Sequence, residues 1–218
     1  MHKIEMGTIK PENFISTWDG QYTFFSHLEF ACGIPNLLFA ITTVKENGKP
    51  NVCFHSWSTF CGDGQAFHAI LGGLSQHGHT YKNMARTGEF VVNFLSKDYY
   101  DSLTATIHKN SEDQDEFEAG GFTKEKAETV KVPRIGEAFL CLECKLDQTL
   151  DLSGAGIISL VIGKVTHIAM QMEYAQGVDR KYGEAGFMFN VHSPKNLATG
   201  EGNTSGVAVL DILRKDTE

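Results

Sequence analysis

Features of membrane, secreted and nucleic-acid-binding proteins are missing from this sequence. No apolar run approaches the length of a transmembrane helix, and the first residues, MHKIEMGTIKPENF, lack the apolar core of a signal peptide. There is no run of Lys or Arg, and the formal net charge of −8 disfavours binding to nucleic acid or to an anionic membrane. We therefore expect a cytoplasmic protein with neither kind of partner.

Proline and cysteine are also scarce. Only 5 prolines accompany 22 glycines, which is typical of a β-rich chain with many tight corners. The 5 cysteines are an odd number and lie among apolar neighbours, so reduced, mostly buried thiols are favoured over a disulfide framework. The length of 218 residues, of which 41% are hydrophobic, fits a single domain over residues 1–218.

Short strands and tight turns are expected over residues 34–95. A β-branched and aromatic run at 36–44 is followed by Asn47-Gly48, the best two-residue hairpin signal, and by a partner strand at 51–59. The pattern then predicts a strand at 66–71 ended by Gly72-Gly73, a helix at 80–86 closed by Gly88, and a strand at 89–95.

Residues 97–135 interrupt this rhythm. A helix is expected at 99–109, and the acidic stretch 112–118 has the composition of a solvated surface. We interpret the whole segment as an insertion that lies over one end of the sheet.

The remaining elements indicate a barrel rather than a parallel sheet. Residues 140–150 alternate with a period of two, and residues 157–170 are apolar throughout, as in a strand buried on both faces. Weaker signals predict a helix start at 10–15, a turn at 18–21, and strands at 183–190 and 207–213. Strands and helices do not alternate regularly, so the pattern favours a mainly β fold, a β-barrel with appended helices.

Two polar corners in residues 51–93 are suited to an anionic ligand. Ser56, Ser58 and Thr59 place three hydroxyl groups within a span of four residues, and a turn follows them. The second corner, Ser75 to Thr80, leads into a helix whose first N–H groups lack intrahelical partners and attract anions. The alternative is a polar edge strand followed by a Ser75 or Thr80 helix cap. Two such corners separated by one strand favour a phosphate site.

The order of short motifs over residues 34–170 resembles the flavin reductase-like family of FMN-binding split-barrel proteins, which includes the flavoredoxins. The motifs are Pro35-Asn36-Leu37-Leu38, Thr42-Thr43, Asn47-Gly48, Asn51-Val52, Ser56-Trp57-Ser58-Thr59, Ser75 with Thr80, Thr87-Gly88-Glu89-Phe90-Val91-Val92-Asn93, Asp115 to Gly120, Val132-Pro133-Arg134-Ile135 and Leu142-Glu143-Cys144. The resemblance implies an FMN-binding split β-barrel, a Greek-key antiparallel barrel with helical insertions. Its core would span about 34–170, with a C-terminal extension at 171–218.

The resemblance also implies a site. In that family FMN lies in a barrel groove near a homodimer interface, and the cofactor, rather than a catalytic side chain, carries the chemistry. The residues at matching positions, which we expect to hold the phosphate and ribityl chain, are Asn51, Ser56, Trp57, Ser58, Thr59, Ser75, His79 and Thr80. Trp57 would either wall the flavin ring or pack in the core.

One departure bears on the electron donor. Many NAD(P)H-dependent members have a Gly-Asp-His triplet before a G-x-V segment, with its His near the nicotinamide. Here Gly163-Lys164-Val165 is present, but the matching triplet is Gly156-Ile157-Ile158. The resemblance therefore fits an oxidoreductase that keeps its FMN and exchanges electrons with a redox protein partner better than it fits an NAD(P)H-dependent reductase of free flavin.

Other interpretations remain open at this point. Cys141 and Cys144 have the CxxC spacing, but strand periodicity puts them on opposite faces, which favours structural thiols over a redox or metal site. His77 and His79, with His55 or His68, could bind a divalent metal ion, although loop histidines beside a phosphate site are the simpler account. The alternative function is a non-enzymatic β-barrel module that binds another phosphate ligand or a partner protein.

Overall fold

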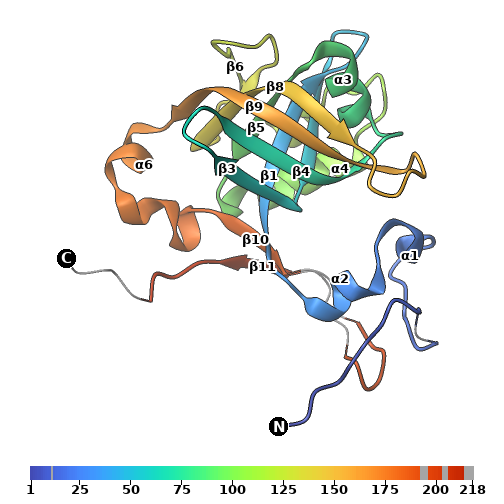
Figure 1. Ribbon diagram of the computed structural model, residues 1–218. Helices are drawn as coiled ribbons and strands as arrows, with labels where there is room; N and C mark the ends of the chain where they lie inside the picture. The colour runs from blue at the N-terminus through green and yellow to red at the C-terminus, as the bar shows by residue number, and fades with distance from the viewer. Residues whose placement is uncertain (11, 192–195, 203–205, 214–218) are drawn as a thin grey trace. The chain divides into compact units, whose positions relative to one another are not determined.

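The computed structural model describes residues 1–10, 12–191, 196–202 and 206–213 (Figure 1). The described residues fall into two compact units, one within Met1–Asn36 and Phe189–Ala208, the other within Leu37–Met188 and Val209–Glu218. None of the helices in these residues is long and apolar enough to cross a membrane.

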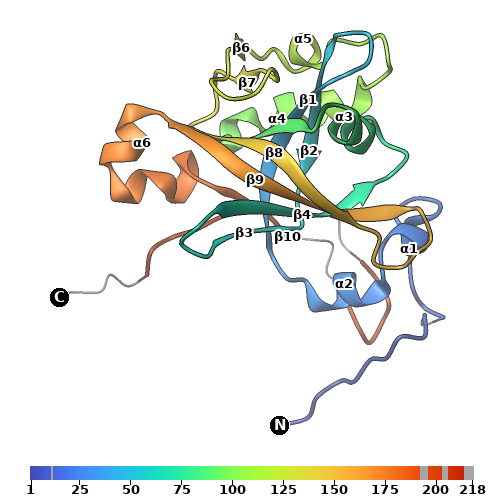
Figure 2. The same cartoon turned by 45° about the horizontal axis from the view of Figure 1, so that its top comes forward.

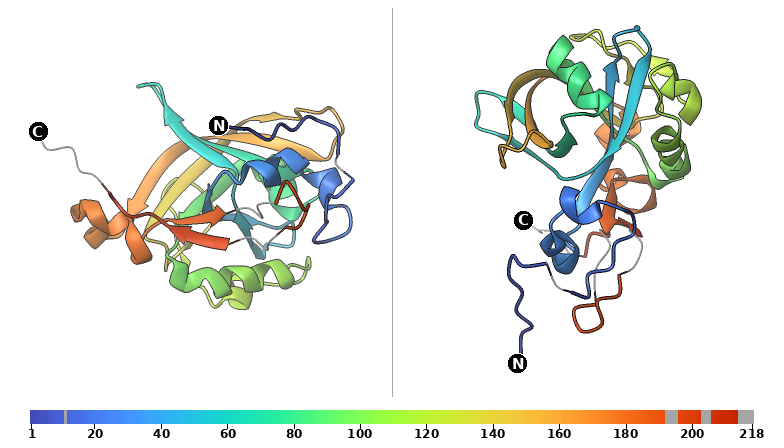
Figure 3. Two further views of the ribbon diagram at one scale, coloured as in Figure 1. Left: turned by 90° about the horizontal axis from the view of Figure 1, so that it is seen from below. Right: turned by 90° about the vertical axis from the view of Figure 1, so that its right-hand side faces the viewer.

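The larger unit is a curled antiparallel sheet, which Figures 2 and 3 show from three further sides. Its strands follow the order β1-β5-β8-β9-β4-β3, and β2 pairs with β1. The strands are β1 (Asn36–Val44), β2 (Pro50–His55), β3 (Ser58–Gly62), β4 (Phe67–Ser75), β5 (Glu89–Phe94), β8 (Leu140–Leu150) and β9 (Ile158–Met170), beside a small pair of β6 (Lys124–Glu125) and β7 (Arg134–Ile135). The expected mainly β split barrel is confirmed.

The β1–β2 hairpin forms as its sequence predicts. Gly48 adopts a left-handed conformation with φ of 84°, and the Lys45 N–H donates to the Lys49 carbonyl at 2.8 Å. The strands pair in register from Val44 with Pro50 to Phe39 with His55. A residue without Cβ adopts this φ at no steric cost, which is why the Asn-Gly pair marks the turn.

Three helices pack against β2, and one end of β2 faces the N-terminus of the first of them. These are α3 (His79–Thr87), α4 (Tyr100–His108, after the 3₁₀ turn η1, Lys97–Tyr99) and α5 (Glu116–Gly120). Helix α3 ends on Gly88 in the left-handed conformation, with φ of 71°. The expected helix and its glycine stop are therefore confirmed, with one more residue at each end.

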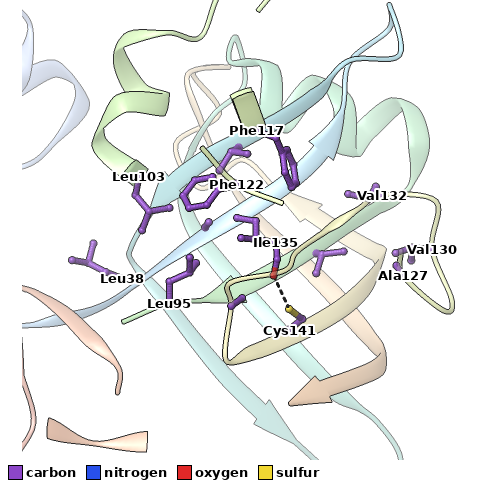
Figure 4. Packing of buried hydrophobic residues seen from close by; sticks show 14 of the residues in the cluster. Leu38, Leu95, Leu103, Phe117, Phe122, Ala127, Val130, Val132, Ile135 and Cys141 are labelled. Carbon is purple, nitrogen blue, oxygen red and sulfur yellow. Dashed lines mark hydrogen bonds between the residues drawn. The ribbon is translucent and has the colours of Figure 1, made fainter. Parts of the chain in front are cut away.

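The sheet is covered on both faces. One hydrophobic cluster contains Leu103, Phe117, Val132, Ile135 and Cys141, so residues 97–135 pack on a face of the sheet (Figure 4). The other cluster contains Phe90 and Cys144 with side chains of β1, β4 and β9. Strand β8 therefore contributes neighbouring side chains to both clusters, as its period of two predicts.

Two strand predictions are wrong. The expected strand at 51–59 is broken at Ser56 and Trp57, because Trp57 takes a left-handed backbone with φ of 55°. Gly72 and Gly73 do not end β4, which continues to Ser75 through an irregularity between Leu71 and Leu74. Glycine there relieves the crowding of a bulge instead of stopping the strand.

The smaller unit contains α1 (Gln21–Phe24), α2 (His27–Cys32) and most of the paired strands β10 (Met188–Val191) and β11 (Gly206–Val209). The expected helix at 10–15 is wrong for residues 12–15, which form a turn followed by irregular chain, and residue 11 lies outside the described range. The hydroxyl of Ser26 caps α2 by accepting from the Leu28 N–H at 3.2 Å.

The C-terminal part of the described chain contains less strand than expected. The segment 183–190 starts with a 3₁₀ turn, η3 (Gly183–Ala185), and only its end is β10. It follows α6 (Met172–Gln176) and a second 3₁₀ turn, η2 (Val178–Lys181). Strand β11 likewise covers only the first part of 207–213.

Candidate functional site

A pocket of about 270 Å³ opens between β2, the start of α3 and α4. Three residues expected from the sequence, Asn51, His79 and Thr80, line it together. The remaining lining residues are Val52, Cys53, Phe54, Gly78, Thr106, Ile107, Asn110 and Glu116. The structure thus brings one corner of the expected site into a single concave surface.

The N-terminus of α3 forms one wall of this pocket. Gly78 is the N-cap, and no described side chain caps the helix. The first N–H groups of a helix have no intrahelical acceptor, so this end carries a partial positive charge. The Nδ2 of Asn51 donates to the Thr80 hydroxyl at 3.1 Å and fixes that hydroxyl group against the helix start. Because the N-cap is Gly78, the interpretation of Ser75 or Thr80 as a simple cap is wrong.

The preceding loop is held by Ser75. Its hydroxyl accepts from the His77 N–H at 3.3 Å, and its carbonyl accepts from the Gly78 N–H at 3.1 Å. Ser75 is therefore a residue that shapes the loop, and it does not line the pocket in the described structure.

Glu116, which lines the pocket, belongs to a buried ion pair that the sequence did not predict. Glu116 is 1% exposed, and its Oε1 lies 2.8 Å from the Lys45 Nζ. Its Oε2 accepts from the Val52 N–H at 2.8 Å. Burial raises the pKa of Glu116, and the contacts with Lys45 and Val52 oppose that rise. The expectation that 112–118 is a solvated surface is therefore wrong for Glu116.

Lys45 itself is buried, with every donor of its ammonium group in use. Besides Glu116, its Nζ donates to the carbonyl groups of Ser111 and Gln114, at 2.8 and 3.0 Å. The pair thus ties the segment before α5 to the β1–β2 hairpin. The only sequence signal for this ion pair was a Lys at the end of an apolar strand, and a Lys at that position is equally compatible with an exposed turn.

Near the pocket mouth, the Nε2 of His79 lies 3.2 Å from a carboxylate oxygen of Glu112. The thiol of Cys53 is also in the lining, and burial raises its pKa to about 11. Cys53 is therefore a protonated, unreactive thiol at neutral pH.

The other expected corner lies outside this pocket. Ser56 is buried, Trp57 is half-buried and Thr59 is exposed. The Ser58 hydroxyl oxygen is buried and has no hydrogen-bond partner among the described residues. An orphaned buried hydroxyl costs about 1–3 kcal/mol, so a ligand that pairs with it would gain from doing so.

Residues 156–158, which stand in place of the Gly-Asp-His triplet, adjoin the Ser75–Thr80 loop. The Gln76 N–H donates to the Ile157 carbonyl at 2.8 Å. In a member with the triplet, the acid would therefore lie beside this loop. Here an apolar side chain takes its place.

The alternatives to a flavin site have little structural support. Among the described residues, no group of three or more His, Cys, Asp and Glu side chains could hold a metal ion. Cys141 and Cys144 are both buried and unpaired with each other, in separate clusters on the two faces of β8. Burial raises the pKa of each thiol, that of Cys141 to about 12. The interpretation of these cysteines as structural thiols is confirmed.

The fold and this site place the chain in a known class. The family model described as "Flavin reductase like domain" matches residues 32–185, so the chain belongs to the flavin reductase-like family. The chain spans 34% to 63% of the length of three curated relatives that it matches.

The chain also resembles individual relatives and solved structures. An uncharacterized protein of Aquifex aeolicus (strain VF5) is 42% identical over 67 residues, which span 31% of this chain and 34% of the relative. The structure of a flavin reductase with a split-barrel domain from Shewanella frigidimarina NCIMB 400 is 18% identical, with a TM-score of 0.70 over 88% of this chain and 90% of that one. The flavoredoxin of Desulfovibrio vulgaris (Miyazaki F) is 17% identical, with a TM-score of 0.61 over 84% and 90% of the two chains. At these identities the two structures show a shared fold.

Proposed function

We propose that this protein binds FMN and transfers electrons through it, with the phosphate in the pocket at the α3 N-terminus. The observation that carries the proposal is the uncapped helix end beside Asn51, His79 and Thr80, in a chain of the flavin reductase-like family. Such a helix end favours an anion, and hydroxyl and amide groups next to it supply directed hydrogen bonds.

The residues present fit a phosphate-bearing flavin. The pocket offers free backbone N–H groups, the Thr80 hydroxyl and the Asn51 amide, while the carboxylate of Glu116 is neutralised by Lys45. The orphaned Ser58 hydroxyl supplies a further polar contact at the other corner. When bound, FMN would supply the redox chemistry, and these residues would bind and orient it.

The electron donor is proposed to be a redox protein, with NAD(P)H as the alternative. Support comes from Ile157 and Ile158, which stand where the acid and His of the NAD(P)H-dependent members would be. We further propose that the protein acts as a homodimer, as its family resemblance implies, and that it works in the cytoplasm, as expected from its sequence.

A visible spectrum tests this function. Purified protein is expected to be yellow, or to become so with added FMN, and to release near-equal amounts of flavin and chain on denaturation. Anaerobic NADH or NADPH alone should leave the visible absorption of the bound flavin unbleached. Colourless protein that takes up no FMN would instead support a non-enzymatic module, and rapid bleaching would identify an NAD(P)H-dependent reductase.

Thr80→Ala is expected to weaken FMN binding by about tenfold, because one directed hydrogen bond to a charged group is worth about 1.5 kcal/mol. The Asn51 amide also loses its acceptor in this variant. Fluorescence titration of FMN would measure the affinity, and riboflavin, which has no phosphate, would serve as the matched ligand. An equal loss for riboflavin would contradict the placement of the phosphate at Thr80. Thr123→Ala, at an exposed position outside the pocket and outside the expected flavin site, is the control variant.

A further inference from the structure

The corner between β2 and β3 has a backbone conformation that its sequence does not favour. Trp57 is the one described non-glycine residue with positive φ, at 55°. A bulky residue pays a steric cost in this conformation, of about 1–2 kcal/mol, and keeps it only where the surroundings fix it. Such residues gather at binding and catalytic sites, so the contacts that fix Trp57 are of functional interest.

Both backbone groups of Gly72 hold this corner. The Gly72 N–H donates to the Trp57 carbonyl at 2.7 Å. The Gly72 carbonyl lies 2.7 Å from the Nε2 of His55. Because a carbonyl oxygen can only accept, Nε2 must carry the proton and donate. His55 and Trp57 therefore clamp Gly72 from the two sides of the corner.

The glycines of β4 are required for this close approach. A Cβ on Gly72 would lie 3.0 Å from the Trp57 carbonyl oxygen. A Cβ on Gly73, whose φ is 68°, would lie 3.1 Å from the Cε3 atom of the Trp57 ring. The indole thus rests on the backbone of the β4 irregularity, two residues before Ser75 and the loop that leads to the proposed phosphate pocket.

His55 is suited to a fixed, neutral role. It is 7% exposed, and its ring contacts those of Phe39 and Trp57, with centroid distances of 5.7 and 6.3 Å. Burial lowers the pKa of His55 to about 4, and the hydrogen bond to Gly72 opposes that shift only in part. The imidazole is therefore uncharged at neutral pH and holds its single donor on Gly72.

We propose that His55 is a positioning residue of the flavin site, which acts through Gly72 to hold Trp57 and Ser58 in the conformation that receives the flavin ring. This inference rests on the proposed function, because it assigns the half-buried indole and the orphaned Ser58 hydroxyl to the ring of the same FMN. His55 itself need not touch the cofactor.

Tryptophan fluorescence monitors the environment of Trp57 in the flavin-free protein. The chain has 2 tryptophans, Trp18 and Trp57, so Trp18→Phe leaves Trp57 as the single reporter. In that background, His55→Leu is expected to shift the Trp57 emission of the flavin-free protein to longer wavelength and to raise its quenching by acrylamide. His55→Gln places an amide N–H near the position of Nε2 and should restore both signals.

The same variants are then compared for FMN binding. His55→Leu is expected to weaken the affinity for FMN by about tenfold and to shift the visible absorption band of the bound flavin, since one buried hydrogen bond and the order of the corner are lost. His55→Gln should bind nearly as well as the parent. Phe39→Leu removes the same ring contact with His55 but no hydrogen bond, so it controls for lost packing and should leave the band unshifted.

A second variant covers the case in which His55→Leu does not fold. Gly73→Ala presses on the indole and leaves His55 and its hydrogen bond in place, and it should produce the same emission shift and the same loss of FMN affinity. Unchanged emission and affinity in a folded His55→Leu protein, or in Gly73→Ala, would overturn the role of His55 while the parent still binds FMN. A parent that binds no FMN would overturn the proposed function as well.

Discussion

Glu143→Gln is expected to lower the free energy of unfolding by about 3–5 kcal/mol, the range found when one partner of a buried ion pair is removed. Glu143 is 0% exposed, and its Oε1 accepts from the Nε and Nη2 of Arg134 at 2.8 and 2.5 Å. Its Oε2 accepts from the N–H and hydroxyl groups of Thr129, at 2.6 and 2.7 Å. The amide would leave the Arg134 charge without its buried partner.

Chemical denaturation would measure this loss. Glu125→Gln is the matched control, because Glu125 pairs with the same guanidinium at 2.9 Å but has a side chain that is 49% exposed. The control should cost at most about 1 kcal/mol. A double variant, Glu143→Leu with Arg134→Met, should be more stable than Glu143→Gln, since it buries no unpaired charge. Equal losses for Glu143→Gln and Glu125→Gln would contradict the argument.

The same carboxylate sets part of the acid sensitivity. Burial alone would raise the pKa of Glu143, but hydrogen bonds from Thr129, Glu128 and Arg134 outweigh burial and hold its pKa at about 2. A pKa below that of the unfolded chain adds stability above pH 4.5, and this stability is lost as the pH falls from about 4.5 to about 2. The contribution is on the order of 3 kcal/mol. Glu143→Gln should therefore show a flatter fall in stability over this window than the parent.

Lys45→Met is expected to cost a similar 3–5 kcal/mol, because it leaves the Glu116 carboxylate buried with the Val52 N–H as its remaining donor in the described structure. The substitution also removes the Lys45 donor from the carbonyl groups of Ser111 and Gln114. Thermal and denaturant unfolding would measure the loss. Lys49→Met is the control, since Lys49 is exposed and donates to the neighbouring carbonyl of Asp113.

The deficit of Lys45→Met should shrink as the medium becomes acidic. Burial already raises the pKa of Glu116, and loss of the ammonium group raises it further. A raised pKa means that the folded variant binds a proton more tightly than the unfolded chain, so its stability rises as the pH falls through that pKa toward 4.5. A deficit that stays constant from pH 8 to pH 5 would show that packing, rather than the unpaired carboxylate, causes the loss.

Local patterns were sufficient for elements whose causes lie close in the chain. The turn at Asn47-Gly48, the stop of α3 at Gly88 and the alternation in β8 each depend on a few adjacent residues. The β-barrel class followed from these elements. The ordered motifs then led to the pocket residues Asn51, His79 and Thr80, which the structure brings together.

Contacts between distant segments could not be predicted in this way. Glu116 is buried because it meets Lys45 from the β1–β2 hairpin, and the composition of 112–118 alone indicates a surface. Trp57 breaks the expected strand because Gly72, on another strand, fixes its backbone. In both cases the decisive partner lies far away in the sequence, so the local composition around Glu116 and the local strand pattern around Trp57 each favour the wrong structure.

The covering of β8 on both faces has a consequence for oxidative damage. Reduced flavins react with oxygen to give peroxide, which attacks thiolates far faster than thiols. Cys141 and Cys144 are enclosed in separate clusters, and burial raises the pKa of both. Cys53, in the pocket lining, is protonated at neutral pH for the same reason. These three thiols are therefore expected to react slowly with peroxide.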